Sequence, residues 1–104
     1  MTPKVYFTSF CTSGGETIPQ KLARLLLSAG MDKIDFKDKY VAIKIHFGEL
    51  GNMAYLRPGY ARVVVDLVKD LGGKPFLTDA NTMYVGSRKN ALDHLETAYI
   101  NGFT

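Results

Sequence analysis

The sequence predicts an α/β fold in which parallel strands form an open sheet between layers of helices. Two observations predict it. Short β-branched or aromatic segments alternate with longer segments whose apolar residues recur at helical spacing. Proline near the start of helical segments and glycine after their ends mark where those helices begin and stop. Strands joined through helices lie parallel with right-handed crossovers, so we expect the order βαβαβα.

The first strand is expected over residues 5–10, where β-branched and aromatic residues precede the turn signal Ser13-Gly14-Gly15. The first helix includes Pro19 in its first turn and ends near Gly30. Its apolar stripe consists of Ile18, Leu22, Leu25, Leu26 and Ala29.

A second strand is expected over residues 40–47, with Val, Ile and Phe on one face and Lys44 and His46 on the other. If helices cover both faces, Lys44 needs a buried partner, for which Asp79 is the obvious counter-ion. A second helix begins at Pro58 and ends at Gly72-Gly73, and a short third strand follows over residues 75–78. The third helix follows Ser87 and ends at Gly102, with Ala91, Leu92, Leu95, Ala98 and Tyr99 apolar.

The length of 104 residues is sufficient for one α/β domain over positions 1–104, and 46% hydrophobic residues can supply a core of ordinary density. Three strands are few for a three-layer, Rossmann-like sheet. We therefore expect a partial domain, the N-terminal fragment of a larger protein. An unpaired edge strand is a template for self-association, so a homodimer through that edge is possible.

Composition excludes several functional classes. The net charge is +3, but the cations are scattered rather than grouped on one face, which does not favour nucleic-acid binding. Cys11 is the single cysteine, so this chain cannot form an internal disulfide or a multi-cysteine metal site, and a reducing cytoplasm is favoured. The start of the chain lacks the pattern of a signal peptide, and no apolar run approaches the ~20 residues that span a membrane.

Ligands of open parallel sheets bind at the carboxyl ends of the strands, which here lead into loops 10–16, 46–57 and 79–87. In the middle loop, His46 can be a base, an acid or a metal ligand, Glu49 a base or a ligand, and Arg57 a bidentate clamp for an anion. Gly48 and Gly51 would let the backbone bend close to a ligand. The alternative is a surface ion pair of Glu49 with Arg57, with His46 packed at a strand end.

Asp79 and Asn81 follow the third strand, where catalytic carboxylates and cation ligands often stand in α/β enzymes. They are equally typical of turns that bond their own backbone. Three other features are interpreted conservatively. His94 is predicted to be structural, and Cys11 is predicted to be a small buried thiol. The segment Ser13-Gly14-Gly15 before a helix is only weakly typical of a phosphate-binding loop. It matches neither the dinucleotide-binding glycine fingerprint nor the Walker pattern with its lysine.

Several motifs resemble a known family when taken in order. They are Val41-Ala42-Ile43-Lys44-Ile45-His46-Phe47-Gly48-Glu49, Gly51-Asn52, Tyr55-x-Arg57-Pro58, Gly72-Gly73-Lys74-Pro75-Phe76-Leu77-Thr78-Asp79-x-Asn81-Thr82-x-Tyr84-x-Gly86-x-Arg88 and Asn101-Gly102-Phe103. They resemble the start of the domain of unknown function 362 family, often described as uncharacterised iron–sulfur centre proteins.

The resemblance implies a longer protein accompanied by ferredoxin-like cysteine motifs that hold four-iron four-sulfur clusters. With one cysteine, this chain cannot ligate such a cluster, because four thiolates are the usual requirement. We therefore expect no cofactor in this chain, and any cluster would belong to a C-terminal region or a ferredoxin-like partner. The resemblance also favours a functional role for the motif residues Lys44, His46, Glu49, Asn52, Arg57, Asp79, Asn81 and Arg88.

The leading hypothesis is a redox-linked enzyme or electron-transfer protein in which this segment supplies part of a pocket for an anionic small molecule. Arg57 and Arg88 would hold the anion, with Asn52 and Asn81 as further ligand-binding residues. Lys44 would set the local charge with Asp79, and His46 or Glu49 would move a proton. One alternative is a non-catalytic module that binds a metal through His46, Glu49 and Asp79. Another is a structural fragment with no activity of its own.

Overall fold

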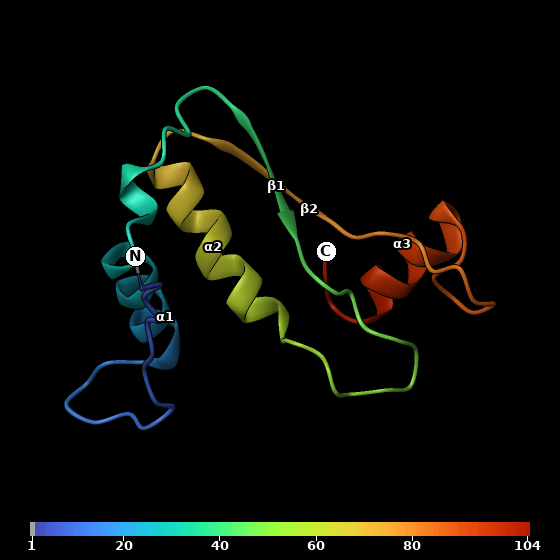
Figure 1. Cartoon of the computed structure of the whole chain (residues 1–104). Coiled ribbons are helices and arrows are strands. Elements are labelled where there is room, and N and C mark those ends of the chain that lie inside the picture. The colour runs from blue at the N-terminus through green and yellow to red at the C-terminus, as the bar shows by residue number, and fades with distance from the viewer. Residues whose placement is uncertain (1) are drawn as a thin grey trace.

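The computed structural model describes residues 2–104 and shows a mixed α/β protein with three helices and a two-stranded parallel sheet (Figure 1). The elements in chain order are α1 (Ile18–Ser28), the 3-10 turn Met31–Lys33, β1 (Tyr40–Lys44), α2 (Pro58–Asp70), β2 (Lys74–Thr78) and α3 (Ala91–Ile100). In the β1–β2 ladder Tyr40 lies opposite Lys74 and Lys44 opposite Thr78. The crossover through α2 is the βαβ connection that the sequence predicts.

Local capping explains where the helices begin. Thr17 caps α1 with a capping box, in which the Thr17 side chain accepts from the Gln20 amide at 3.3 Å and the Gln20 side chain accepts from the Thr17 amide at 2.8 Å. Pro58 occupies the first turn of α2, as predicted. Asn90 caps α3 by accepting from the Asp93 amide at 3.0 Å. All three predicted helices are therefore confirmed.

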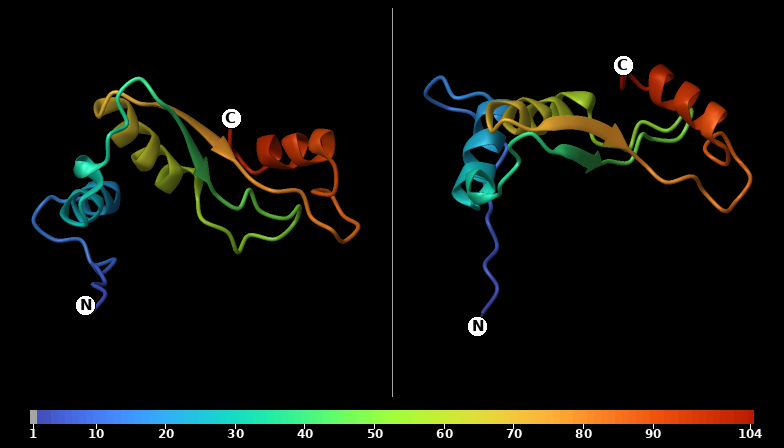
Figure 2. Two further views of the ribbon diagram at one scale, coloured as in Figure 1. Left: turned by 45° about the horizontal axis from the view of Figure 1, so that its top comes forward. Right: turned by 90° about the horizontal axis from the view of Figure 1, so that it is seen from above.

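The predicted first strand over residues 5–10 is wrong. The segment forms no strand, and Val5 and Phe7 are 91% and 84% exposed. In both views of Figure 2 the N-terminal trace lies apart from the two strands. A strand is stabilised by a paired neighbour and by packing of its faces, which β-propensity alone does not supply. The described element order is therefore αβαβα, and Cys11, expected as a buried thiol, is exposed.

The layers also differ from the expectation. Helix α2 packs against β1 and β2, whereas α1 packs against α2 rather than covering the second face of the sheet (Figures 1 and 2). On that second face Tyr40 is 79% and Phe76 48% exposed. The core centres on α2, where Ala61, Val63 and Val68 are buried. The described residues thus form a layer of helix on one face of the sheet and leave its other face open.

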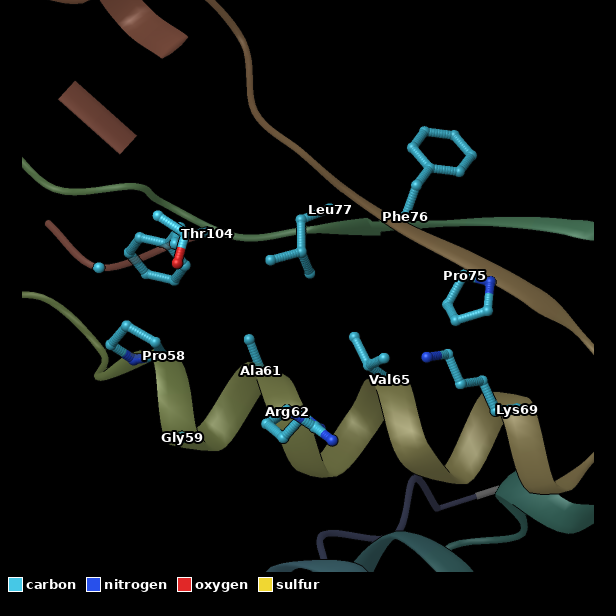
Figure 3. Close-up of a pocket in the computed structure, with 12 residues that line it drawn as sticks. Pro58, Gly59, Ala61, Arg62, Val65, Lys69, Pro75, Phe76, Leu77 and Thr104 are labelled. Atoms are coloured by element: carbon cyan, nitrogen blue, oxygen red, sulfur yellow. The ribbon is translucent and has the colours of Figure 1, made fainter. Parts of the chain in front are cut away.

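A groove of about 630 Å³ runs between α2 and β2 and ends at the C-terminal residues (Figure 3). Ala61 and Val65 line it from α2, and Pro75 and Leu77 line it from β2. None of the site residues predicted from the sequence lines this groove. Among residues 2–104, no helix combines the length and the apolar character that crossing a membrane requires.

Strand β1 is shorter than the predicted range of 40–47, and the reason bears on the site. The Ile45 amide still donates to the Thr78 carbonyl at 3.0 Å. Two residues later the Phe47 amide donates to the side chain of Asp79 at 3.2 Å instead of to a backbone carbonyl. The ladder ends because a carboxylate replaces the neighbouring strand as the acceptor.

Candidate functional site

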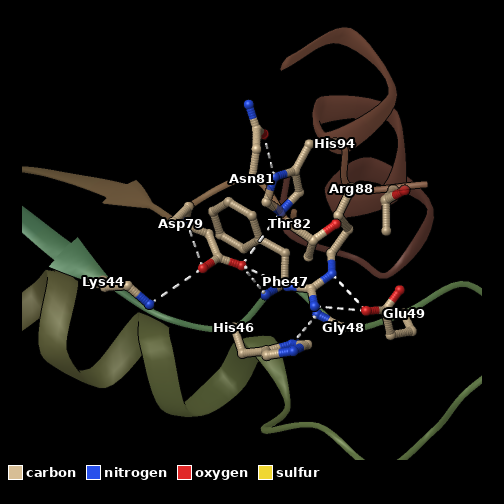
Figure 4. A network of polar contacts seen from close by, with 12 residues as sticks. Lys44, His46, Phe47, Gly48, Glu49, Asp79, Asn81, Thr82, Arg88 and His94 are labelled. Atoms are coloured by element: carbon tan, nitrogen blue, oxygen red, sulfur yellow. Dashed lines mark hydrogen bonds and ion pairs between the residues drawn. The ribbon is translucent and has the colours of Figure 1, made fainter. Parts of the chain in front are cut away.

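A network of polar side chains joins the loops that follow β1 and β2 to helix α3 (Figure 4). Its members come from the end of β1, the loop after it, the end of β2 and the segment that leads into α3. This is the carboxyl edge of the parallel strands, where the sequence predicts the site.

Asp79 lies at the centre of the network, with its side chain only 4% exposed. Its Oδ1 atom accepts from the Ala80 amide at 2.8 Å and from Lys44 Nζ at 3.3 Å. Its Oδ2 atom accepts from the Phe47 amide at 3.2 Å and from Arg88 Nη1 at 3.3 Å. The predicted pairing of Lys44 with Asp79 is confirmed, and Asp79 is far more than a turn former.

These contacts set the ionisation of Asp79. Burial by itself raises the pKa of a carboxyl group because it penalises the charged form. Hydrogen bonds from the Ala80 and Phe47 amides and from Lys44 outweigh that penalty and hold the pKa of Asp79 below its ordinary value. Asp79 is therefore a buried carboxylate, and it is negatively charged at neutral pH.

Arg88 is buried on the other side of Asp79, with 7% of its side chain exposed. Its Nε and Nη2 atoms donate to Glu49 Oε1 at 2.9 and 2.6 Å, and Nη2 also contacts the Tyr84 hydroxyl at 2.9 Å. The Tyr84 hydroxyl donates to the same Glu49 oxygen. The partner of Glu49 is thus Arg88 rather than Arg57, and the guanidinium is largely occupied by protein groups.

Glu49 and Arg88 also stabilise each other's charge. The hydrogen bonds from Arg88 and then from Tyr84 lower the pKa of Glu49, and the bond to Glu49 raises the pKa of Arg88 despite burial. A carboxylate held by two donors with a lowered pKa is a poor proton acceptor at neutral pH. Glu49 therefore fits a positioning role better than the role of a base.

The loop after β1 bends sharply at Gly48, which has a φ of +86°. The Gly48 amide donates to His46 Nδ1 at 2.9 Å, while the His46 side chain remains exposed. A Cβ atom on Gly48 would lie 2.6 Å from Asn101 Nδ2 and 2.8 Å from the Tyr55 ring. Asn101 Nδ2 in turn donates to the Phe47 carbonyl at 2.9 Å, so the end of α3 holds this loop in place.

Replacing Gly48 with alanine is expected to destabilise the protein by about 1–2 kcal/mol more than the same change at Gly51. Both glycines have positive φ values, +86° and +82°, so both alanines bear similar backbone strain. Only Gly48 meets other atoms, since nothing lies within 4 Å of a Cβ on Gly51. Urea unfolding of the two variants measures the difference, and equal losses would contradict the close packing at Gly48.

The sequence predicts a purely structural role for His94, yet its side chain joins the network. It is buried on α3, its Nδ1 lies 2.9 Å from Asn81 Oδ1, and its Nε2 lies 3.3 Å from Asp79 Oδ2. Helix α3 buries His94, Thr97 and Ala98, whereas Leu92 and Leu95 of the apolar stripe are exposed. The helix turns its polar residues inward because they bond the neighbouring loops, as Thr97 Oγ1 does with the Ser87 carbonyl at 2.9 Å.

Two predicted residues remain outside the network. Asn52 is exposed and accepts from the Ala54 amide at 2.8 Å, so it shapes its own turn. Arg57 is exposed at the N-cap of α2 and makes no side-chain capping bond. The network therefore gathers Lys44, Glu49, Asp79 and Arg88 directly, includes Asn81 through His94, and places His46 at its margin.

The structure does not gather the proposed metal ligands. Across residues 2–104, no three side chains of His, Cys, Asp or Glu form a group that could hold a metal ion. The oxygens of Asp79 and the Oε1 atom of Glu49 accept hydrogen bonds from protein donors instead. No geometric observation here favours His46, Glu49 and Asp79 as a metal centre.

Comparison with known proteins identifies a family. Residues 41–104 match the family model described as domain of unknown function (DUF362), which covers more than half of the chain. The match includes every motif on which the resemblance was based and every residue of the network. No curated protein and no solved structure matches the chain.

Proposed function

The chain belongs to the DUF362 family, and we propose that the carboxyl edge of its sheet binds an anionic small molecule that carries a carboxylate or phosphate group. One observation carries the proposal. The Lys44 side chain is 69% exposed, and its ammonium group pairs with Asp79, whose side chain is only 4% exposed. An exposed cation anchored by a buried anion is held ready for a ligand from solvent.

The bonding capacity of Lys44 supports this role. An ammonium group has three donors, and one of them is directed to Asp79 Oδ1 at 3.3 Å. The remaining donors are available to a carboxylate or phosphate, with which a charge-assisted hydrogen bond is about twice as strong as a neutral one. Two backbone amides and Arg88 fix Asp79 in turn, so Lys44 loses little freedom when a ligand binds.

We propose that His46 and Arg57 supplement this cation. His46 lies two residues further along the same face of the chain, and Arg57 stands at the N-terminus of α2, where backbone amides attract anions. In this proposal Arg88 holds Glu49 and Asp79 rather than the ligand. A buried ion pair is a weak source of stability compared with apolar packing, which favours a functional reason for this network.

Further parts of the proposal concern the whole protein. We propose a redox-linked protein whose iron–sulfur cluster is held outside this chain, by a further region or a ferredoxin-like partner, because Cys11 alone cannot ligate one. The exposed Tyr40 and Phe76 support a covering layer on the open face, as in a three-layer, Rossmann-like sheet. A reducing cytoplasmic location fits the single thiol.

Replacing Lys44 with methionine is expected to weaken binding of inorganic phosphate or succinate at least tenfold, because a charge-assisted hydrogen bond is lost. Isothermal titration calorimetry at low salt measures both ligands. The matched control is Lys39→Met, which removes an exposed lysine paired with Asp35 at 3.1 Å near the opposite end of β1. Equal affinity in Lys44→Met and the wild type, or no saturable binding in the wild type, would refute the proposal.

A further inference from the structure

The outer edge of β1 has no strand beside it. Just after β1, the Ile45 amide donates to the Thr78 carbonyl of β2 at 3.0 Å. Alternate residues of a parallel strand bond the same neighbour, so the odd-numbered residues of β1 are the ones that bond β2. The backbone groups of Tyr40, Ala42 and Lys44 therefore point to the outer edge. In the described part of the chain the sheet has two strands, and no third strand pairs with that edge.

The outer edge of β2 suits an added strand less well. The same alternation applies there, and because Thr78 bonds β1, the backbone groups of Pro75 and Leu77 face outward. Proline has no amide hydrogen, so this edge lacks one of the donors that a neighbouring strand would need. The edge of β1 keeps all of its outward amides and is the better template for pairing.

Residues 5–10 have the complementary deficiency. The segment is β-branched and aromatic, yet it forms no strand, and in the described part of the chain none of its backbone groups bonds another backbone group. Its apolar side chains Val5, Phe7 and Phe10 are exposed. In an extended strand Val5 and Phe7 would lie on one face and Tyr6 and Phe10 on the other. Apolar residues on both faces are typical of a strand within a parallel sheet.

We propose that residues 5–10 of one chain add as a strand to the outer edge of β1 in a second copy, so that two copies exchange their N-terminal segments. Within one chain the segment and the edge are held apart. Lys21 Nζ donates to the Cys11 carbonyl at 2.6 Å, which fastens the end of the segment to α1. Among the described residues, α1 packs against α2 and makes no contact with β1. The right view of Figure 2 shows the N-terminal trace extending away from the sheet, where a second molecule can reach it.

A second copy is the occupant that satisfies both deficiencies at once. Each copy offers one segment and one edge, so a reciprocal exchange between two copies closes the assembly at a dimer. The six aromatic side chains of the two segments offer roughly 1,000 Å² of surface, the area at which specific interfaces begin. Pairing uses the backbone of β1, whereas the proposed anion site uses the Lys44 side chain. The inference therefore does not depend on that site.

Analytical ultracentrifugation of the whole chain over a concentration series tests the exchange. We expect a monomer–dimer equilibrium whose dissociation constant rises at least tenfold in Phe7→Asp, because the added strand would carry a charge into apolar surroundings. Phe7 is 84% exposed and belongs to no helix or strand, so this substitution spares the fold of the single chain. The matched control is Leu92→Asp, which places the same charge on another exposed apolar residue, in α3, and should leave the dissociation constant unchanged.

Mixed isotope labelling locates the added strand without any substitution. In a sample that combines nitrogen-15-labelled with carbon-13-labelled chains, we expect nuclear Overhauser contacts between residues 5–10 of one chain and residues 40–44 of the other. A chain that stays monomeric up to about 1 mM would overturn the inference. So would a dimer that Phe7→Asp does not weaken, oligomers larger than a dimer, or contacts between the two segments that arise only within one chain.

Discussion

Replacing Arg88 with methionine is expected to lower the free energy of unfolding by about 3–5 kcal/mol, the cost of breaking a buried ion pair by removing one partner. Methionine retains much of the apolar stem, so the loss reports the charge and its hydrogen bonds rather than a cavity. Asp79, with its side chain 4% exposed, would lose one of its two charged donors, and Glu49 would lose both of the hydrogen bonds it receives from Arg88.

The chain offers a matched control in Arg62. Its Nε donates to Asp66 Oδ1 at 2.9 Å in an exposed pair on α2, so Arg62→Met removes the same type of contact in water. Exposed pairs contribute about 0–1 kcal/mol, and we expect a loss in that range. Urea denaturation followed by circular dichroism compares the variants. A loss below 1 kcal/mol for Arg88→Met would mean that the network is not a stable part of the fold.

The helices were predictable because their signals are local. Pro58 in the first turn of α2, Gly102 just after α3 and the stripe of α1 all act within one or two turns of the residue concerned, although α3 begins after Asn90 rather than directly after Ser87. The strand over residues 5–10 failed because a strand depends on a partner that local sequence does not provide. The orientation of α3 could not be predicted from apolar spacing, since the loops that bond His94 and Thr97 decide it.

The site was predictable in composition but not in pairing. The position of Asp79 after a strand and opposite Lys44 follows from the parallel arrangement, and that contact is present. Glu49 and Arg88 are 39 residues apart, and their contact depends on how two irregular loops fold. A buried histidine looks the same in sequence whether or not its second nitrogen has a partner. His94 could therefore be recognised only once its neighbours were placed.

Replacing Asp79 with asparagine is expected to destabilise the protein by about 3 kcal/mol at pH 7, although the side chain keeps its shape. The carboxylate accepts from two cations and two backbone amides. An asparagine amide has one oxygen, so its NH₂ group would take the place of one Oδ atom. Each Oδ atom now accepts two hydrogen bonds, and an NH₂ group in that position would face those donors without being able to accept from them. At least one of these buried donors would lose its acceptor, which is costly in a low-dielectric site.

The same substitution changes the response of the protein to acid. Since the pKa of Asp79 is lowered in the folded state, its contribution is fully present above the unfolded value of about 3.9 and is lost as the pH falls through the folded pKa. Glu49 and Asp35, whose pKa values are also lowered, act in the same direction and remain in the variant. The variant should therefore lose less stability than the wild type between pH 5 and pH 3, while still losing some.

Urea unfolding in steps from pH 7 to pH 3 tests both parts of this expectation. The control is Asp66→Asn, whose carboxylate is 51% exposed and pairs with Arg62 across one turn of helix. It should change stability at pH 7 by less than about 1 kcal/mol. If Asp79→Asn loses stability in acid as steeply as the wild type, Asp79 is not the buried anion on which Lys44 is anchored, and the proposed anion site loses its foundation. A flatter profile together with lower stability at pH 7 would instead show that an ionised Asp79 carboxylate anchors Lys44 in the site.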